Sequence, residues 1–129
     1  MIQRMQTLYI ILGAIFHFWI WQAQSEFPYS LFIILLGTVL VLVTIFSYNN
    51  RKRQVTLLYL MIAMSLILIF DSIWMIISPA PGMFAAPIPA KFFGQLQLIS
   101  QIFAIIFYIL AIKRIKKDDD LIKSIDRIR

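Results

Sequence analysis

The sequence predicts an all-α membrane protein with four transmembrane helices, and three observations lead to this class. Hydrophobic residues make up 61% of the 129 residues and charged residues 14%, against about 45–50% and about 25% in soluble domains. Four apolar runs are each long enough for a spanning helix, which needs about 17–25 residues. A soluble fold of this size has too little interior to hide four such runs from water.

The four predicted spans are residues 7–23, 29–48, 55–77 and 92–112, followed by a tail at 113–129. We expect residues 1–129 to form a single integral membrane domain. Short polar segments join the first three spans. The joint before the last span contains four prolines, which cannot continue a helix without losing backbone hydrogen bonds.

A cleaved signal peptide is the alternative interpretation of the first run. Arg4 precedes the run, and AQS at residues 23–25 has the small residues of a cleavage site. The start carries little charge and the run is rich in aromatic residues, which is not the usual signal-peptide pattern. A spanning helix is therefore the favoured interpretation.

Basic residues predict the orientation, because Lys and Arg near span ends are retained in the cytoplasm. With both termini on one side, Lys91 is the one basic residue on the other. We therefore expect both termini in the cytoplasm. The basic residues at the span ends should also contact anionic lipid head groups as membrane-surface anchors: Arg51, Lys52, Arg53, Lys113, Arg114, Lys116 and Lys117.

Composition also limits the chemistry. The formal charge of +6 would suggest nucleic acid in a soluble protein, but here the basic residues follow the span ends, so we expect no nucleic-acid partner. The chain has no cysteine and one histidine, which excludes disulfides and thiolate or His-rich metal sites. No nucleophile–base pair or phosphate-binding glycine loop is present. We expect no enzyme activity, no cofactor and no metal site.

Two ionisable residues fall inside the predicted spans, where they are costly and are candidates for function. His17 and Asp71 each lie six residues from the outer end of their span, or about 9 Å below it. The last span adds two glutamines on one face. We therefore predict a polar layer in the outer half of the bundle, formed by His17, Asp71, Ser72, Gln97 and Gln101.

Two roles for this layer remain open at this point, beside a contact with a partner at the membrane edge. In the first, the His17 ring donates a hydrogen bond to the Asp71 carboxylate and fixes helix packing. In the second, the layer is a proton or solute site, since His titrates near neutrality. No continuous polar route crosses the four runs, which favours the packing role.

The tail predicts a short C-terminal amphipathic helix. Three successive acids, Asp118 to Asp120, suit the start of a helix, and on a helix they point about 100° apart and cannot share a metal ion. An apolar docking stripe follows, made of Leu121, Ile122, Ile125 and Ile128. Alternatively the fourth helix runs on unbroken, with Arg114 and Asp118, and Asp119 and Lys123, as favourable pairs.

A helix this short must dock on something to be stable in water. The stripe suits a lipid surface, a cytoplasmic protein or a second copy of the chain, and the sequence does not separate these.

The two ends of the chain, MIQRMQTLYIILGAI and AIKRIKKDDDLIKSIDRIR, resemble the ends of domain-of-unknown-function family 4293, a family of small bacterial membrane proteins with four spans. The resemblance implies a multi-pass protein of the bacterial inner membrane and carries no catalytic or binding residues with it. We therefore expect a non-enzymatic accessory, assembly or interaction protein. The alternative is a small transporter or a proton- or ion-coupled protein that uses Asp71 and His17.

Overall fold

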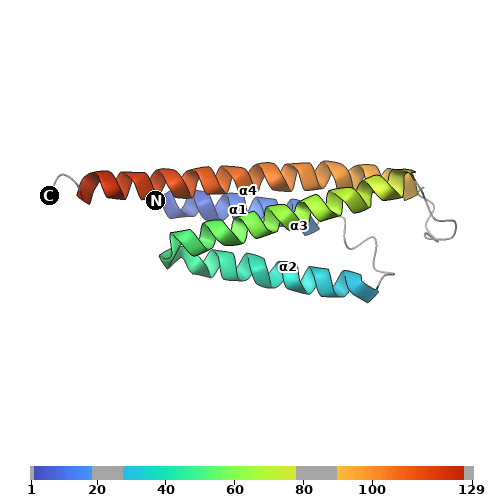
Figure 1. The fold of residues 1–129 in the computed structure, drawn as a ribbon, viewed down its shortest axis with the longest axis horizontal. Coiled ribbons are helices and arrows are strands. Elements are labelled where there is room, and N and C mark those ends of the chain that lie inside the picture. The colour runs from blue at the N-terminus through green and yellow to red at the C-terminus, as the bar shows by residue number, and fades with distance from the viewer. Residues whose placement is uncertain (1, 19–27, 78–89, 127–129) are drawn as a thin grey trace.

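The computed structural model describes residues 2–18, 28–77 and 90–126, and four α-helices account for nearly all of them (Figure 1). The helices are α1 (Ile2–Phe18), α2 (Pro28–Phe46), α3 (Arg51–Ile77) and α4 (Ala90–Asp126), with a 3₁₀ turn, η2 (Ser47–Asn49), between α2 and α3. The all-α class is therefore confirmed. Residues 19–23 of the first predicted span and most of the proline-containing joint, residues 78–89, lie outside the described residues.

Side chains fix the turn between α2 and α3. The side-chain oxygen of Asn50 accepts a hydrogen bond from the backbone N–H of Arg53 at 3.1 Å, which is the arrangement of a helix N-cap. The side chain of Gln54 donates to the backbone carbonyl of Thr44 at 3.2 Å. These bonds hold the basic first turn of α3 close to the end of α2.

Most of the packing involves α4. It lies along both α1 and α3, whereas α2 lies beside α3 and makes far fewer contacts (Figure 1). Its buried face follows alternating steps of four and three residues, the spacing that keeps one side of a helix against its neighbours. We call these positions the packing seam of α4: Gln97, Gln101, Ala104, Tyr108, Ala111, Ile115 and Asp118.

The closest approach of α1 to α4 depends on a glycine. A Cβ built on Gly13 would lie 2.5 Å from Cε1 of Tyr108, so the buried tyrosine ring occupies the space that a side chain at position 13 would need. One turn further along α1, Phe16 stacks on Phe103 and Phe107 with ring centroids 5.3 and 5.6 Å apart. Aromatic packing therefore joins these two helices over much of their length.

The prediction of a separate C-terminal amphipathic helix is wrong, because α4 continues without a break from Ala90 to Asp126. The acids do not start a new helix; two of them, Asp118 and Asp119, make side-chain contacts within the continuing helix α4 and with α1. Asp118 accepts a hydrogen bond from Gln6 of α1, and Asp119 pairs with Lys123 at 2.8 Å, four residues further along. The unbroken helix considered as the alternative is the one that forms.

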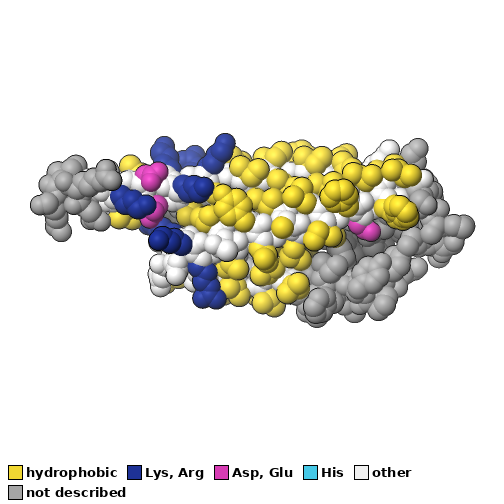
Figure 2. All heavy atoms as spheres, viewed as in Figure 1, with side chains coloured by type: hydrophobic (Ala, Val, Ile, Leu, Met, Phe, Trp, Pro, Cys, Tyr) yellow, Lys and Arg dark blue, Asp and Glu magenta, His cyan; other side chains and the backbone are white. Residues whose placement is uncertain are grey.

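Basic and apolar side chains occupy separate parts of the bundle surface. Lys and Arg side chains gather at one end, over the start of α3 and the distal half of α4, while apolar side chains cover the middle (Figure 2). We call this the basic end. Large apolar residues face outward, as Ile67 and Phe70 do with 67% and 74% of their surface exposed. An apolar belt of this kind is unfavourable in water.

Two helical segments among the described residues are long and apolar enough to cross a membrane, Arg51–Trp74 and Gly94–Ser124. The apolar stretches found in α1 and α2 are shorter, at Met5–Phe18 and Leu36–Asn49. The structure thus contains the four helices that the sequence predicts, with two candidate spans by length and composition.

Candidate functional site

The interior of the bundle contains a polar cluster around His17. Nδ1 of His17 lies 3.0 Å from the hydroxyl of Ser65 on α3. Gln101 of α4 lies beside the ring, and its Nε2 donates to the backbone carbonyl of His17 at 3.2 Å. All three residues are buried, so the cluster joins α1, α3 and α4 at a single level of the bundle.

The hydrogen bonds indicate which ring nitrogen carries a proton. Ser65 has one hydroxyl proton and donates it to the carbonyl of Met61 at 3.1 Å, so its oxygen accepts from Nδ1–H of His17. In a neutral ring Nε2 is then an acceptor. Nε2 of His17, Oε1 of Gln101 and the hydroxyl of Tyr108 are buried without a hydrogen bond within the described part of the chain. The cluster therefore has two acceptors and one donor left to satisfy.

Asp71 does not belong to this cluster, and its predicted hydrogen bond with His17 does not form. It follows Ser65 by six residues, or about 9 Å along α3, and the same six residues rotate its side chain by about 240°. Ser65 is therefore buried and level with His17, whereas Asp71 is exposed. The prediction failed because it counted depth along each apolar run from its end, whereas His17 lies opposite Ser65, six residues before Asp71.

The remaining predicted polar residues lie closer to Asp71. Gln97 is fully buried on the packing seam of α4, and its side chain lies near Asp71. The hydroxyl of Ser72, also buried, donates to the carbonyl of Leu68 at 2.7 Å in its own helix. The predicted layer thus divides into an inner cluster at His17 and Gln101 and an outer group around Asp71.

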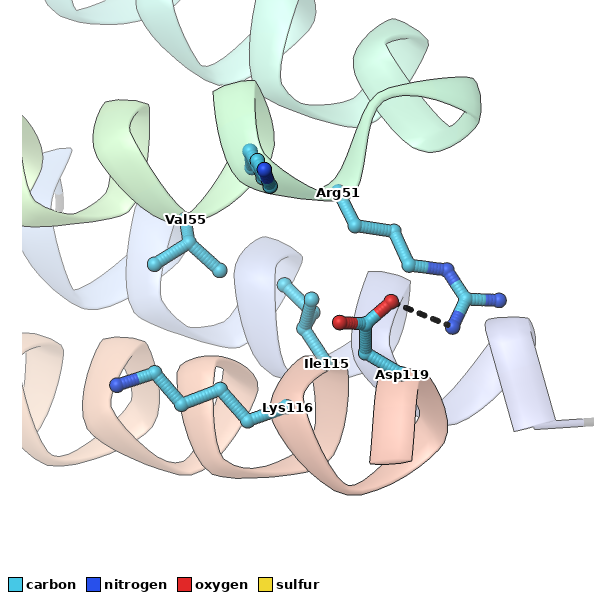
Figure 3. A pocket seen from close by; sticks show the side chains of 6 residues that line it. Arg51, Val55, Ile115, Lys116 and Asp119 are labelled. Atoms are coloured by element: carbon cyan, nitrogen blue, oxygen red, sulfur yellow. Dashed lines mark ion pairs between the residues drawn. The ribbon is translucent and has the colours of Figure 1, made fainter. Parts of the chain in front are cut away.

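The basic end contains contacts that tie three helices together. Asp118, which is 9% exposed, accepts from Gln6 of α1. Asp119 lies 3.8 Å from Nη1 of Arg51 on α3 (Figure 3). Lys116 Nζ donates to the hydroxyl of Tyr59 on α3 at 3.3 Å. The distal half of α4 is therefore attached to both neighbours where the predicted anchors gather.

Asp119 is held in its charged form by this surrounding. It lies beyond the apolar part of α4, and 40% of its side-chain surface is exposed. The hydrogen bond from Lys123 and the nearby positive charge of Arg51 hold the pKa of its carboxyl below the usual value. The exposure of the pair keeps its contribution to stability small.

The predicted docking stripe is only partly described. Leu121 and Ile122 are 47% and 46% exposed on the last turns of α4. The side chain of Ile125 and the whole of Ile128 lie outside the described residues. No group of three or more His, Cys, Asp or Glu side chains that could hold a metal ion occurs in the described ranges.

Sequence reasoning missed two contacts, that of Gln6 with Asp118 and that of Ser65 with His17. In both cases the residue spacing along the helix contained a signal. Extending the four-and-three pattern from Gln97 along α4 reaches Asp118, which predicts that this acid faces the interior and needs a polar partner such as Gln6. Ser65 and Ser72 are seven residues apart and so lie on one face of α3, which could have identified Ser65 as an inward-facing residue.

Comparison with known proteins identifies a family. A family model described as "Domain of unknown function (DUF4293)" matches residues 21–128, which includes all of α2, α3 and α4. The family named from the resemblance is thereby confirmed, by a match that includes most of the closing segment but not the first 20 residues. No curated protein and no solved structure matches the chain.

Proposed function

The chain belongs to the family described as domain of unknown function DUF4293, and we propose that it is a bacterial inner-membrane protein that acts, without catalysis, as an interaction or assembly protein. Its contact element is the part of α4 that continues past the other helices. The observation that carries the proposal is the unbroken course of α4 through residues 113–126.

Helix lengths support a multi-pass arrangement. The 17 residues of α1 and 19 of α2 fall within the range of about 17–25 that a spanning helix needs. The 27 residues of α3 and 37 of α4 extend about 40 and 55 Å, beyond a hydrocarbon core of about 30 Å. The excess length of α4 falls at the basic end, which supports a position of its last turns outside the bilayer.

Charge supports an orientation with both termini in the cytoplasm. The start of α3 and the distal half of α4 carry their Lys and Arg at the same end of the bundle (Figure 2). Basic residues at span ends are retained on the cytoplasmic side. The basic end therefore faces the cytoplasm, and the extension of α4 projects into it.

The packing seam of α4 points to a helical protein partner rather than the lipid surface. The steps of four and three that lead to Asp118 continue to Ile122 and then to position 125. Ile122 is nonetheless 46% exposed, and α4 extends past the ends of the other helices along the long axis of the bundle (Figure 1). The apolar seam of α4 continues beyond the helices that pack against it, and such a surface can bind an amphipathic helix of a cytoplasmic protein.

Site-specific photocrosslinking in native membranes tests this proposal. A photoreactive amino acid at Ile122 should give one discrete crosslinked product, while the same amino acid at the exposed Lys113 should give none. In the first protein, an additional Leu121→Glu substitution should remove the product by placing a charge in the apolar contact. Removal of residues 121–129 should abolish co-purification of the crosslinked partner, while the contacts of Asp118 with Gln6 and of Asp119 with Arg51 remain.

Three results would count against the proposal. Crosslinking to lipid alone would mean that the stripe docks on the membrane surface, and a product that contains two copies of this chain, shown with two differently tagged forms, would mean self-association. Equal products from Ile122 and Lys113 would mean that the contact is not specific to the seam.

A small ion-coupled transporter that uses Asp71 and His17 is the second candidate. The observation that favours it is that Nε2 of His17 and Oε1 of Gln101 are buried without a hydrogen bond to any described residue. Asp71 lies six residues, or about 1.7 helical turns, from Ser65, the residue that contacts His17, and this separation weighs against a shared site. Proton flux in liposomes that is lost in both Asp71→Asn and His17→Gln would establish this alternative.

A further inference from the structure

A pocket at the basic end lies between the start of α3 and the distal half of α4 (Figure 3). Its volume is about 250 Å³. Its lining combines three cations and one carboxylate with an apolar floor: Arg51, Lys52, Lys116, Asp119, Val55 and Ile115. The pocket therefore has a positive rim above a surface that water does not solvate well.

Arg51 has hydrogen-bonding capacity that the protein does not use. Its Nη1 is shielded from solvent and makes no hydrogen bond within the described residues. The nearest anionic contact recorded for it, Oδ1 of Asp119, is 3.8 Å away, which is too long for a hydrogen bond. Asp119 is already engaged by Lys123 at 2.8 Å. A phosphate oxygen in the pocket would supply the acceptor that Nη1 lacks.

The apolar part of the pocket continues along α3 toward the middle of the bundle. Val55 is followed on the same helical face by Tyr59 and Leu66, which are 51% and 48% exposed. Lys116 extends along this face, away from Asp119 (Figure 3), and its Nζ lies 5.8 Å from the centre of the Tyr59 ring. A ligand with its anionic group at Arg51 would meet apolar and aromatic surface in this direction, with the Lys116 ammonium beside the Tyr59 ring.

We propose that this pocket binds the phosphate head group of an anionic phospholipid, with Arg51 and Lys52 on the phosphate and the acyl chains against the apolar face of α3. The proposal rests on the membrane placement given above but not on the partner of α4. Free inorganic phosphate shares the head-group chemistry, but it would leave the apolar floor at Val55 and Ile115 without a contact.

Substitution of Asp119 distinguishes an anionic ligand from a cationic one, because the two should respond in opposite directions. Its carboxylate lines the pocket and repels a bound phosphate, so replacing it with Asn should strengthen binding. If the pocket served only to pair Arg51 with Asp119, the same substitution would do nothing for lipid binding. If it held a cation, the substitution would weaken binding of that cation and leave the lipid unaffected.

Native mass spectrometry of the full chain, released from micelles, measures the bound lipid. Phosphatidylglycerol and phosphatidylcholine with the same acyl chains are titrated separately. We expect one phosphatidylglycerol to bind several-fold more tightly than phosphatidylcholine. Lys52→Gln should weaken it about fivefold, the effect of one basic residue near a phosphate, and Asp119→Asn should tighten it by a similar factor. Inorganic phosphate at millimolar concentration should not displace it.

Matched controls separate a built pocket from a generally basic surface. Arg53→Gln and Lys117→Gln remove the same charge from exposed neighbours that do not line the pocket, and each should change binding less than twofold. Equal losses in Lys52→Gln and Arg53→Gln, equal binding of the two lipids, or tight binding of inorganic phosphate would overturn the proposal. If the crosslink at Ile122 were absent while lipid binding was intact, the proposed protein partner of α4 would be contradicted and the lipid pocket would stand.

Discussion

The serine at position 65 determines how the single histidine is held in the interior. Its hydroxyl donates within its own helix and accepts from His17, so a short side chain satisfies one ring nitrogen across two helices. Interhelical hydrogen bonds between membrane helices contribute about 0.6 kcal/mol on average and up to about 1.7. Ser65, which has no charge and belongs to no motif, therefore holds the His17 ring, whereas Asp71 does not contact it.

Ser65→Ala should destabilise the bundle because it leaves a buried N–H of His17 without an acceptor. We expect a loss of about 1 kcal/mol, measured by reversible unfolding in mixed micelles. Tyr108→Phe is the matched control, since its hydroxyl is buried without a partner among the described residues. Removing it should change stability by less than about 0.5 kcal/mol.

A different ranking of these two variants would contradict the hydrogen-bond assignment around His17. If Tyr108→Phe cost more than Ser65→Ala, the tyrosine hydroxyl would have to be the donor that Nε2 of His17 accepts. The ring would then be held from both nitrogens.

The choice of Ser65 over Asp71 could not be predicted from the sequence. Both residues lie in one apolar run, and the sequence identifies which residues are polar but not the level at which two helices meet. A shift of six residues moves the contact by about 9 Å and turns it to another face. That a polar group would hold His17 was predictable, whereas its identity depended on the register between α1 and α3.

At the scale of the helices, the approach of α1 to α4 depends on the missing side chain at Gly13. An alanine within a helix is normally favoured over glycine by about 1 kcal/mol. Here its Cβ would lie 2.5 Å from the ring of Tyr108, which is fully buried and cannot move aside freely. Whether alanine at position 13 raises or lowers the stability therefore depends on whether α1 and α4 can move apart.

Gly13→Ala should destabilise the protein by about 1–3 kcal/mol, the usual cost of overpacking, in the same unfolding measurement. Gly37→Ala of α2 is the matched substitution. Its Cβ would lie 2.7 Å from the far end of the Phe18 ring, a partly buried side chain that can rotate away, so we expect a smaller cost. Equal or reversed effects would mean that α1 and α4 are not packed as closely as Tyr108 and Gly13 indicate.

The continuity of α4 shows how two local signals can compete. Acids at residues 118–120 favour a helix start, yet they also form favourable pairs four residues apart in a continuing helix. The contact of Gln6 with Asp118 decides the outcome, and it joins residues 112 positions apart. Local sequence rules contain no information about such a contact, although the four-and-three spacing of the seam does.

At the scale of the whole molecule, the sequence predicted the four helices but not their unequal roles. Apolar runs and the polar joints between them are local properties, so the helices could be placed from the sequence. The position of α2 at the side of α3 depends on which apolar faces fit together, and four nearly uniform apolar runs do not specify that. The gathering of basic residues at one end follows from the topology and was predictable.

The topology itself is the last prediction, and the absence of native cysteines makes it directly measurable. Single cysteines are introduced at Gln24, Asn49, Gly82 and Ser124 and are exposed to a membrane-impermeant thiol reagent in spheroplasts. With four spans and both termini inside, Gln24→Cys and Gly82→Cys should react in intact spheroplasts, while Asn49→Cys and Ser124→Cys should react only after lysis. If only α3 and α4 cross the bilayer, Gln24→Cys would also need lysis, because the chain before α3 would remain on the cytoplasmic side. Labelling of Ser124→Cys from outside would reverse the orientation and would place both the α4 extension and the phosphate pocket outside the cytoplasm.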